Sequence, residues 1–163
     1  MSCSENISNA RKITDDSIQT NKIDTTAGAP LVIDTNTIVI LSNKNVNFFS
    51  LKDSTPAKLT NQDIQITDSL LETSVKLYNL GIDSTKVYSG YIARQKYKWQ
   101  YVPYINSKGE KKVFINCFCS GVGGFDKWKE KLIEVDDGGS CFFNTTVNLT
   151  NKNCGPLLIN GPG

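Results

Sequence analysis

The stretch from Tyr97 to Cys119, YKWQYVPYINSKGEKKVFINCFC, constrains the fold more than any other part of this sequence. Apolar side chains recur at every second position on both sides of a short polar turn, a period that is typical of β-strands. Asn106 suits the first position of the turn, and Gly109 is able to adopt the positive φ that closes a four-residue hairpin loop. The stretch therefore predicts a β-hairpin that turns at residues 106–109.

Further strands are predicted around this hairpin. Pro103 lies within its first strand, and because proline has no backbone N–H we expect an edge position or a bulge there. Residues 140–149 alternate in the same way and predict a third strand, and residues 157–160 predict a short last one. Between them, residues 125–132 have apolar side chains at helical spacing over about two turns.

Residues 59–82 predict the one long helix of the chain. Thr60 is a good N-cap, and Asp63 follows it at the spacing of a capping box. Gly81 falls where a left-handed residue ends a helix. One helix face is predicted by the following residues: Ile64, Thr67, Leu71, Val75 and Tyr78.

A long helix followed by consecutive antiparallel strands predicts an α+β fold. We expect one long helix packed on a curved antiparallel sheet of four or more strands, the arrangement of cystatin-like and NTF2-like domains. The length of 163 residues suits one domain. Residues 1–29 are rich in Ser, Thr, Asn, Asp and Lys and predict a flexible leader, so residues 30–163 form the single α+β domain.

The composition excludes several classes of function. The chain has no histidine, which rules out Ser-His-Asp and Cys-His catalysis and any histidine-ligated zinc site. The net charge of +2 is too close to neutral to predict a nucleic-acid or membrane binder from bulk charge. No run approaches the roughly 20 apolar residues of a membrane helix, and the first residues lack the apolar region of a signal peptide. We predict no catalytic, cofactor-binding or metal-binding residue.

An odd number of cysteines, five, suggests that one of them has a separate role. Cys3 lies in Ser-Cys-Ser directly after Met1, which resembles the junction left when a bacterial lipoprotein signal is removed. In that interpretation Cys3 carries a lipid and the leader is a tether. The alternative interpretation is a plain cysteine in a disordered tail.

The other four cysteines are disulfide candidates: Cys117, Cys119, Cys141 and Cys154. Cys117 and Cys119 point to one face of a strand about 7 Å apart, too far to bond each other. A cross-strand disulfide from either one to Cys141 is feasible where the two lie opposite, with Cys154 as partner for the remaining thiol. For an exported protein we favour a structural disulfide over buried thiols. A four-thiolate metal site is disfavoured because paired CxxC spacing is absent.

Two charged stretches allow a functional and a plain interpretation. Basic residues between Arg94 and Lys112 alternate with aromatic ones, as in surfaces that bind a single nucleic-acid strand or an anionic glycan. An ordinary sheet with its lysines in water is favoured instead. The acids Glu134, Asp136 and Asp137 precede two glycines and favour a solvated turn over a calcium loop.

Three segments of this chain resemble a group of small, uncharacterised exported proteins and lipoproteins of bacteria. The segments are LTNQDIQITDSLLETSVKLYN at 59–79, WQYVPYINSKGEKKVFINCFC at 99–119 and DKWKEKLIEVDDGGSCFFNTTVNLTNKNCGPLLINGPG at 126–163. The resemblance implies export and one compact domain, and it supplies no catalytic residue. Gln100–Tyr104 also approach the inhibitor motif of cystatins, Gln-x-Val-x-Gly, but Tyr104 replaces the glycine, which weighs against protease inhibition.

These observations predict a cell-envelope protein with a non-enzymatic, tethered binding or interaction domain. It would be exported to the periplasm or held at a membrane through Cys3, with an envelope protein or surface ligand as partner. The alternative is a small-ligand-binding or enzymatic protein with a cavity between the helix and the curved sheet. Asn116, Asn144 and Tyr104 are the candidate polar groups of that cavity. We expect no cofactor, and nucleic acid is a disfavoured partner.

Overall fold

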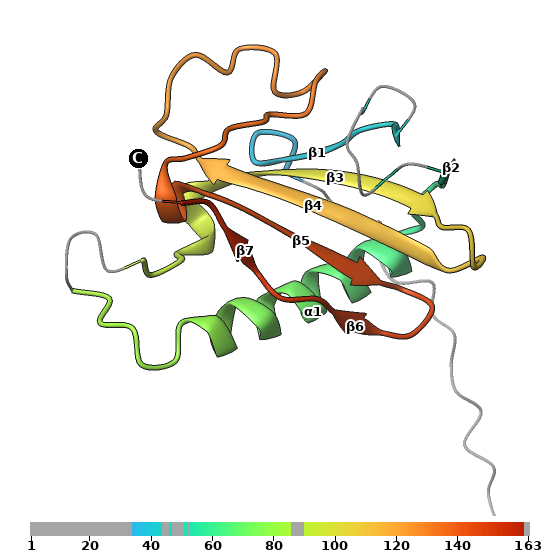
Figure 1. Cartoon of the computed structure of the whole chain (residues 1–163), viewed down its shortest axis with the longest axis horizontal. Helices are drawn as coiled ribbons and strands as arrows, with labels where there is room; N and C mark the ends of the chain where they lie inside the picture. Colours follow the sequence, from blue (N-terminus) through green and yellow to red (C-terminus); the bar gives the residue numbers. More distant parts are fainter. Residues whose placement is uncertain (1–33, 44–45, 47–50, 52, 86–89, 162–163) are drawn as a thin grey trace, which may run out of the picture.

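The computed structural model describes residues 34–161 apart from 44–45, 47–50, 52 and 86–89. The predicted leader at 1–29, including Cys3, lies outside the described residues. The predicted α+β class is confirmed, since one helix packs on a seven-stranded sheet that is mostly antiparallel (Figure 1). The sheet is not strongly curled, so the expected curvature around the helix is not observed. In the described part of the chain, no helix is long and apolar enough to cross a membrane.

The predicted hairpin forms the centre of the sheet. β3 (Tyr97–Ile105) and β4 (Lys111–Cys119) pair without interruption from one end to the other. Gly109 has a φ of 77° and its N–H donates to the Asn106 carbonyl at 2.9 Å. The Asn106 side-chain oxygen accepts the N–H groups of Lys108 and Glu110, each at 3.0 Å. The turn residues therefore fix the hairpin as the sequence predicts.

Short strands extend the hairpin on both sides. β5 (Phe142–Asn148) pairs antiparallel with β4, and β6 (Asn153–Cys154) and β7 (Leu158–Ile159) pair with β5. On the other side, β1 (Ile38–Ile40) runs parallel to β3 and makes the sheet mixed. β2 (Thr55–Pro56) pairs antiparallel with the other end of β3.

Pro103 lies neither at an edge nor in a bulge, contrary to the prediction. β3 has neighbours on both sides, and its pairing with β4 is regular through Pro103 and Val113. Trp99 and Pro103 are four residues apart in β3, so their backbone nitrogens point to the same side of the strand. The Trp99 N–H donates to the Thr37 carbonyl beside β1. On that side the Pro103 carbonyl accepts the Ala57 N–H at 3.3 Å, directly after β2, so the proline leaves only the second bond of this antiparallel pair unmade.

α1 (Asn61–Tyr78) begins with the predicted capping box. The Asp63 N–H donates to Thr60 Oγ1 at 3.1 Å, and the Thr60 N–H donates to the Asp63 carboxylate at 2.7 Å. Lys111 of β4 adds an ion pair to the same carboxylate at 2.6 Å, which ties the helix start to the sheet. Gly81 has the expected positive φ, 82°, two residues after the C-cap Asn79.

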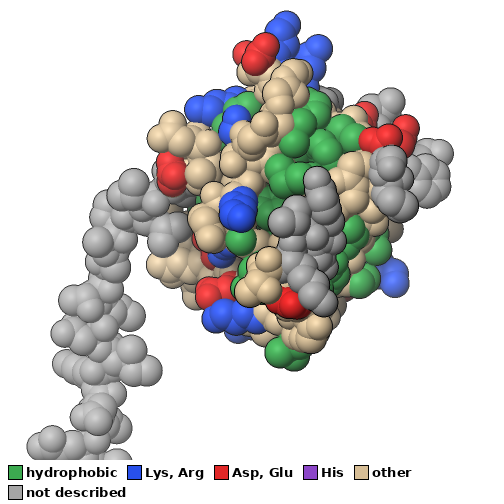
Figure 2. Space-filling view, turned by 90° about the vertical axis from the view of Figure 1, so that its left-hand side faces the viewer, with side chains coloured by type: hydrophobic (Ala, Val, Ile, Leu, Met, Phe, Trp, Pro, Cys, Tyr) green, Lys and Arg blue, Asp and Glu red, His purple; other side chains and the backbone are tan. Residues whose placement is uncertain are grey.

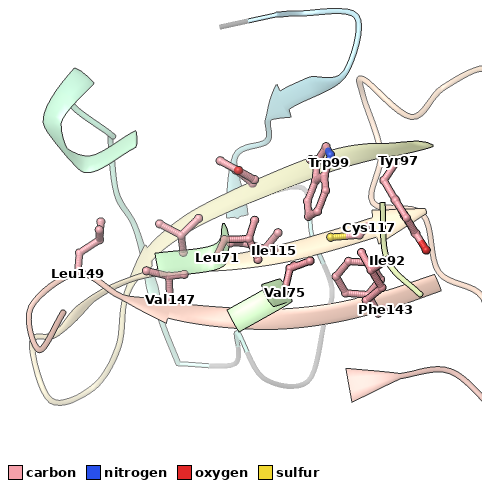
Figure 3. Packing of buried hydrophobic residues seen from close by; sticks show 12 residues of the cluster. Leu71, Val75, Ile92, Tyr97, Trp99, Ile115, Cys117, Phe143, Val147 and Leu149 are labelled. Carbon is pink, nitrogen blue, oxygen red and sulfur yellow. The ribbon is translucent and has the colours of Figure 1, made fainter. Parts of the chain in front are cut away.

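Apolar side chains of α1, β3, β4 and β5 meet between the helix and one face of the sheet (Figure 3). The buried members are Leu71, Val75, Ile92, Tyr97, Trp99, Tyr101, Val113, Ile115, Cys117, Phe143, Val147 and Leu149. The Phe143 ring contacts the rings of Tyr97 and Trp99 edge-on, at centroid distances of 5.2 and 5.8 Å. Aliphatic and aromatic side chains together therefore fill the layer between helix and sheet.

The opposite, outer face of the sheet is also buried. A second cluster there contains Leu41, Val46, Leu51, Val102, Tyr104 and Phe114. Farther along this face, Phe118 packs edge-on against the Trp128 ring at 6.1 Å. Residues 126–130 form turns rather than the two-turn helix predicted over 125–132, and the carbonyls of Trp128 and Lys131 accept hydrogen bonds from Gln100 of β3.

The side of the molecule near the C-terminal end of α1 carries exposed apolar side chains. Leu77, Leu80 and Tyr91 are 63%, 74% and 41% exposed. Figure 2 looks onto this side of the molecule, where hydrophobic side chains gather in the upper half of the view and charged side chains are scattered around them. None of the three residues lines the groove described below.

Candidate functional site

Three side-chain amides form a row across the outer face of the sheet. Gln100 of β3 lies opposite Asn116 of β4, and Asn116 lies opposite Asn144 of β5. All three are one residue out of phase with the core residues Trp99, Cys117 and Phe143, so they point away from α1. Strand register alone thus brings these amides together.

Gln100 is fully buried and all of its hydrogen-bonding capacity at Nε2 and Oε1 is used. Its Nε2 donates to the carbonyls of Trp128 and Lys131, each at 2.6 Å. Its Oε1 accepts from Asn116 Nδ2 at 2.9 Å and from the Ile133 N–H at 2.8 Å. The segment from 128 to 133 is therefore held on the sheet by one polar side chain.

Two asparagines extend this attachment along the segment. Asn116 Nδ2 also donates to the Ile133 carbonyl at 2.6 Å. Asn160, directly after β7, donates to the carbonyls of Val135 and Asp137. The carbonyls of Lys131, Ile133, Val135 and Asp137 are thus bound by side-chain amides.

A groove of about 350 Å³ lies between this segment and the sheet. Residues 132–136 form one wall, and Asn116, Asn144, Phe142 and Asn160 supply the rest of the lining. Glu134 and Asp136, predicted to lie in a solvated turn, are exposed and line the groove. The third acid of that turn is Asp137, and its backbone carbonyl accepts a hydrogen bond from the Asn160 side chain.

The groove differs from the predicted cavity in its position and in the residues that line it. The sequence predicts a cavity between helix and sheet, but buried apolar side chains fill that layer, and the groove lies on the opposite face. Asn116 and Asn144 both line it, as predicted for a polar site. Tyr104 does not, because it lies in the second apolar cluster with 6% of its surface exposed.

Cys119 and Cys141 form a disulfide with a Cα–Cα distance of 4.9 Å. The register explains this pairing: Phe118 lies opposite Phe142, so the next step outward places Cys119 opposite Cys141. The bond fastens the end of β4 to the short turn η4 (Gly139–Cys141) that precedes β5.

Cys117 and Cys154 are free thiols, so the predicted second pairing is not observed. Cys117 lies opposite Phe143 and Cys154 lies opposite Val147. Those positions on β5 are four residues apart, roughly 13 Å along a strand, beyond the reach of a disulfide. Cys117 is fully buried, and this burial raises its thiol pKa well above the ordinary value.

Of the six basic residues between Arg94 and Lys112, three form ion pairs with acids in the described part of the chain. Arg94 bonds to Asp68 at 2.7 Å, and Lys112 bonds to Glu110 at 2.9 Å. Trp99 and Tyr101 of the same stretch are buried in the core, where they are not available to stack on bases. The plain interpretation of this stretch, as part of an ordinary sheet, is therefore favoured by the geometry.

Comparison with known proteins gives no relative. No protein-family model, curated protein or solved structure matches this chain. The resemblance to exported bacterial proteins accordingly stays a prediction, and the groove is interpreted from its own geometry.

Sequence reasoning missed two of the residues that build the groove, Gln100 and Asn160. A signal for Gln100 was present, since Val102 and Phe118 share its face and imply that this face is buried. A polar side chain between buried apolar ones must find hydrogen-bond partners. Asn160 offers no comparable signal, because its partners lie far away in the chain in an irregular segment.

Proposed function

We propose that this chain is a non-enzymatic binding domain that works outside the cytoplasm, and that the groove on the outer sheet face is its ligand site. The observation that carries the proposal is the groove with its row of amides on β4 and β5. Its volume of about 350 Å³ falls in the range of roughly 300–1,000 Å³ that is usual for small-ligand sites.

The groove is supported by a rigid frame. Asn116 and Asn144 project from β4 and β5, which form the longest pairing of the sheet after the hairpin, and the facing segment is fixed by Gln100 and Asn160. A site whose walls are already ordered loses less conformational entropy when a ligand binds. This arrangement supports a preformed binding site.

The side chains of the groove favour binding over catalysis. Its described lining contains no serine, threonine, cysteine or lysine that could act as a nucleophile. Its two carboxylates, Glu134 and Asp136, are both exposed to solvent, whereas an acid–base pair requires two different environments.

Export is supported by the disulfide between Cys119 and Cys141, because such bonds persist in oxidising compartments. The periplasm or the surface of a bacterial envelope membrane is the proposed location. Cys3, as a lipid attachment site, would hold the domain at that membrane. Two signals, or one lipid and a further contact, are usually needed for stable anchoring.

Two measurements test the proposal. Peptide mapping of the unreduced protein from its native host should find Cys119 linked to Cys141, and free thiols at both positions would contradict export. For binding, a small-molecule screen by ¹⁵N NMR should shift the side-chain amide signals of Asn116 and Asn144. Asn144→Trp, which fills the groove, should abolish those shifts at Asn116, while Asn153→Trp on the exposed edge strand β6 should preserve them. A screen in which ligands bind both variants equally would contradict a site in the groove.

A further inference from the structure

We infer that the groove binds an alkylammonium group, the chemistry shared by a lysine side chain of a partner peptide and the end of a polyamine. The inference rests on the proposed function and adds the class of ligand. It follows from three properties of the lining, namely its charge, its unused hydrogen-bonding groups and its apolar wall.

The charge of the lining is negative. Glu134 and Asp136 line the groove, and no lysine or arginine does. Within the described residues, neither carboxylate forms an ion pair. An anionic ligand would therefore meet uncompensated like charge, whereas a cation would gain a partner that the fold does not supply.

Apart from the amide of Asn144, the side-chain hydrogen-bonding groups left in the groove are acceptors. Asn116 and Asn160 use their N–H groups on carbonyls of residues 133–137 and on Gln100, so their own oxygens are what remains. The two carboxylates accept only. A primary ammonium has three donors and no acceptor, which matches such a lining, whereas a sugar hydroxyl also needs donors to bond to.

Asn144 supplies the floor of the groove. Its side chain makes no hydrogen bond with the described residues, although it lies half-buried beside Asn116. The side-chain oxygen of Asn144 is free to accept a hydrogen bond from the ammonium group, and the carboxylates of Glu134 and Asp136 line the same groove.

The apolar part of the lining fits the methylene stem of such a ligand. Leu132, Val135 and Phe142 contribute it. Phe142 is fixed in place, since its ring packs edge-on against Phe125 at 5.9 Å. A Cβ added at Gly138 would come within 2.5 Å of the Phe142 ring, so that glycine is required for the ring to lie there. Long cationic side chains bind in this manner, with the stem on an apolar surface and the head at polar groups.

The test is a titration of the full-length protein with small probes, monitored through the NMR signals of the Asn116 and Asn144 side-chain amides. The probes are n-butylammonium chloride, spermidine and a short peptide that has blocked termini and one lysine. The neutral comparison compounds are n-butanol and glucose. The ammonium probes should shift the groove signals, and the neutral ones should not. Tighter binding of the peptide than of butylammonium supports a protein partner, and tighter binding of spermidine supports a free polyamine.

Two charge-matched double variants make the test specific. Glu134→Gln with Asp136→Asn removes the two groove carboxylates. Each exposed charge pair changes affinity by up to about fivefold, so the loss of both should weaken ammonium binding by roughly tenfold. Asp126→Asn with Glu130→Gln removes the same charge from exposed positions outside the groove and should change it by less than about twofold.

The outcomes separate the two ideas. Equal weakening in both double variants would show attraction by bulk charge and would overturn the inference. Binding of glucose or butanol in the groove, with no response to ammonium, would overturn the ligand class and leave the proposed function standing. No response of the groove signals to any probe or library compound would overturn both.

Discussion

Asn116 Nδ2 donates a hydrogen bond to Gln100 Oε1 at 2.9 Å across the β3–β4 pair. The two residues lie directly opposite each other in the ladder, and Gln100 is fully buried. Gln100 also forms hydrogen bonds with the backbone of residues 128–133, and these bonds hold that segment over the outer face of the sheet. One amide pair thus determines where the wall of the groove lies.

Replacing Gln100 with leucine should release this wall. The variant leaves the Ile133 N–H and two carbonyls without their partners, and a buried polar group without a partner costs about 1–3 kcal/mol. We expect the free energy of unfolding in urea to fall by roughly 2–3 kcal/mol, because the segment regains part of its hydrogen bonding from water. Gln95→Leu, at an exposed position, is the control and should change it by less than about 0.5 kcal/mol. Equal effects of the two variants would refute the role of Gln100.

Removing the disulfide should destabilise the domain without changing its fold. Cys119 and Cys141 are separated by 22 residues, and closing a loop of that size in the unfolded chain corresponds to about 3 kcal/mol. The double variant Cys119→Ala with Cys141→Ala should therefore melt at a lower temperature than the wild type, and a reducing agent should lower the melting temperature of the wild type but not that of the double variant. Cys154→Ala is the matched control, and its melting temperature should respond to the reducing agent as the wild type does.

The hairpin and the helix could be predicted because the residues that define them are close together in the chain. Asn106 and Gly109 fix one turn, and Thr60 and Asp63 fix one helix start, through bonds between residues three or four apart. Local bonds of this kind depend on the sequence of a few neighbours alone. The disulfide was predicted as one of two alternatives for the same reason, since alternation places Cys117 and Cys119 on one face.

The groove could not be predicted because it depends on contacts between distant residues in an irregular segment. Gln100 reaches Lys131, and Asn160 reaches Val135, across 31 and 25 residues. No periodicity marks residues 132–137 as the cover of a sheet face. Val102 and Phe118 indicate that the outer face is buried, but the sequence does not show which segment covers it, so Asn116 and Asn144 were assigned to a cavity on the wrong side of the sheet.

The capping box of α1 predicts a local stability effect. Thr60→Ala removes the acceptor of the Asp63 N–H, and losing an N-cap of this kind costs about 1 kcal/mol. Thr73→Ala, at an exposed position in the middle of the same helix, is the control and should be neutral or slightly stabilising because alanine favours helix. Urea unfolding of the two variants measures the difference, and a Thr60→Ala variant as stable as Thr73→Ala would contradict the cap.

Glu110 should make the stability of the domain depend on acid pH. Its carboxylate accepts hydrogen bonds from Lys112, Asn106, Asn148 and Asn151, which lower its pKa from the ordinary 4.5 to about 2. Because the pKa is depressed in the folded state, the stabilisation is complete above pH 4.5 and is lost as the pH falls toward 2. NMR titration of the folded protein should find this carboxyl still ionised at pH 3.5, whereas a midpoint near 4.5 would contradict the network.

The Glu110 carboxylate also connects two turns of the sheet. Asn106 belongs to the β3–β4 turn, while Asn148 and Asn151 belong to the end of β5 and the turn after it. Glu110→Gln keeps the shape of the side chain but removes its charge, so the variant should lose less stability than the wild type between pH 5 and pH 2.5. Glu130→Gln changes an exposed acid and should follow the wild-type pH dependence. A Glu110→Gln protein whose stability declines as steeply as that of the wild type would show that other carboxyls dominate the acid response.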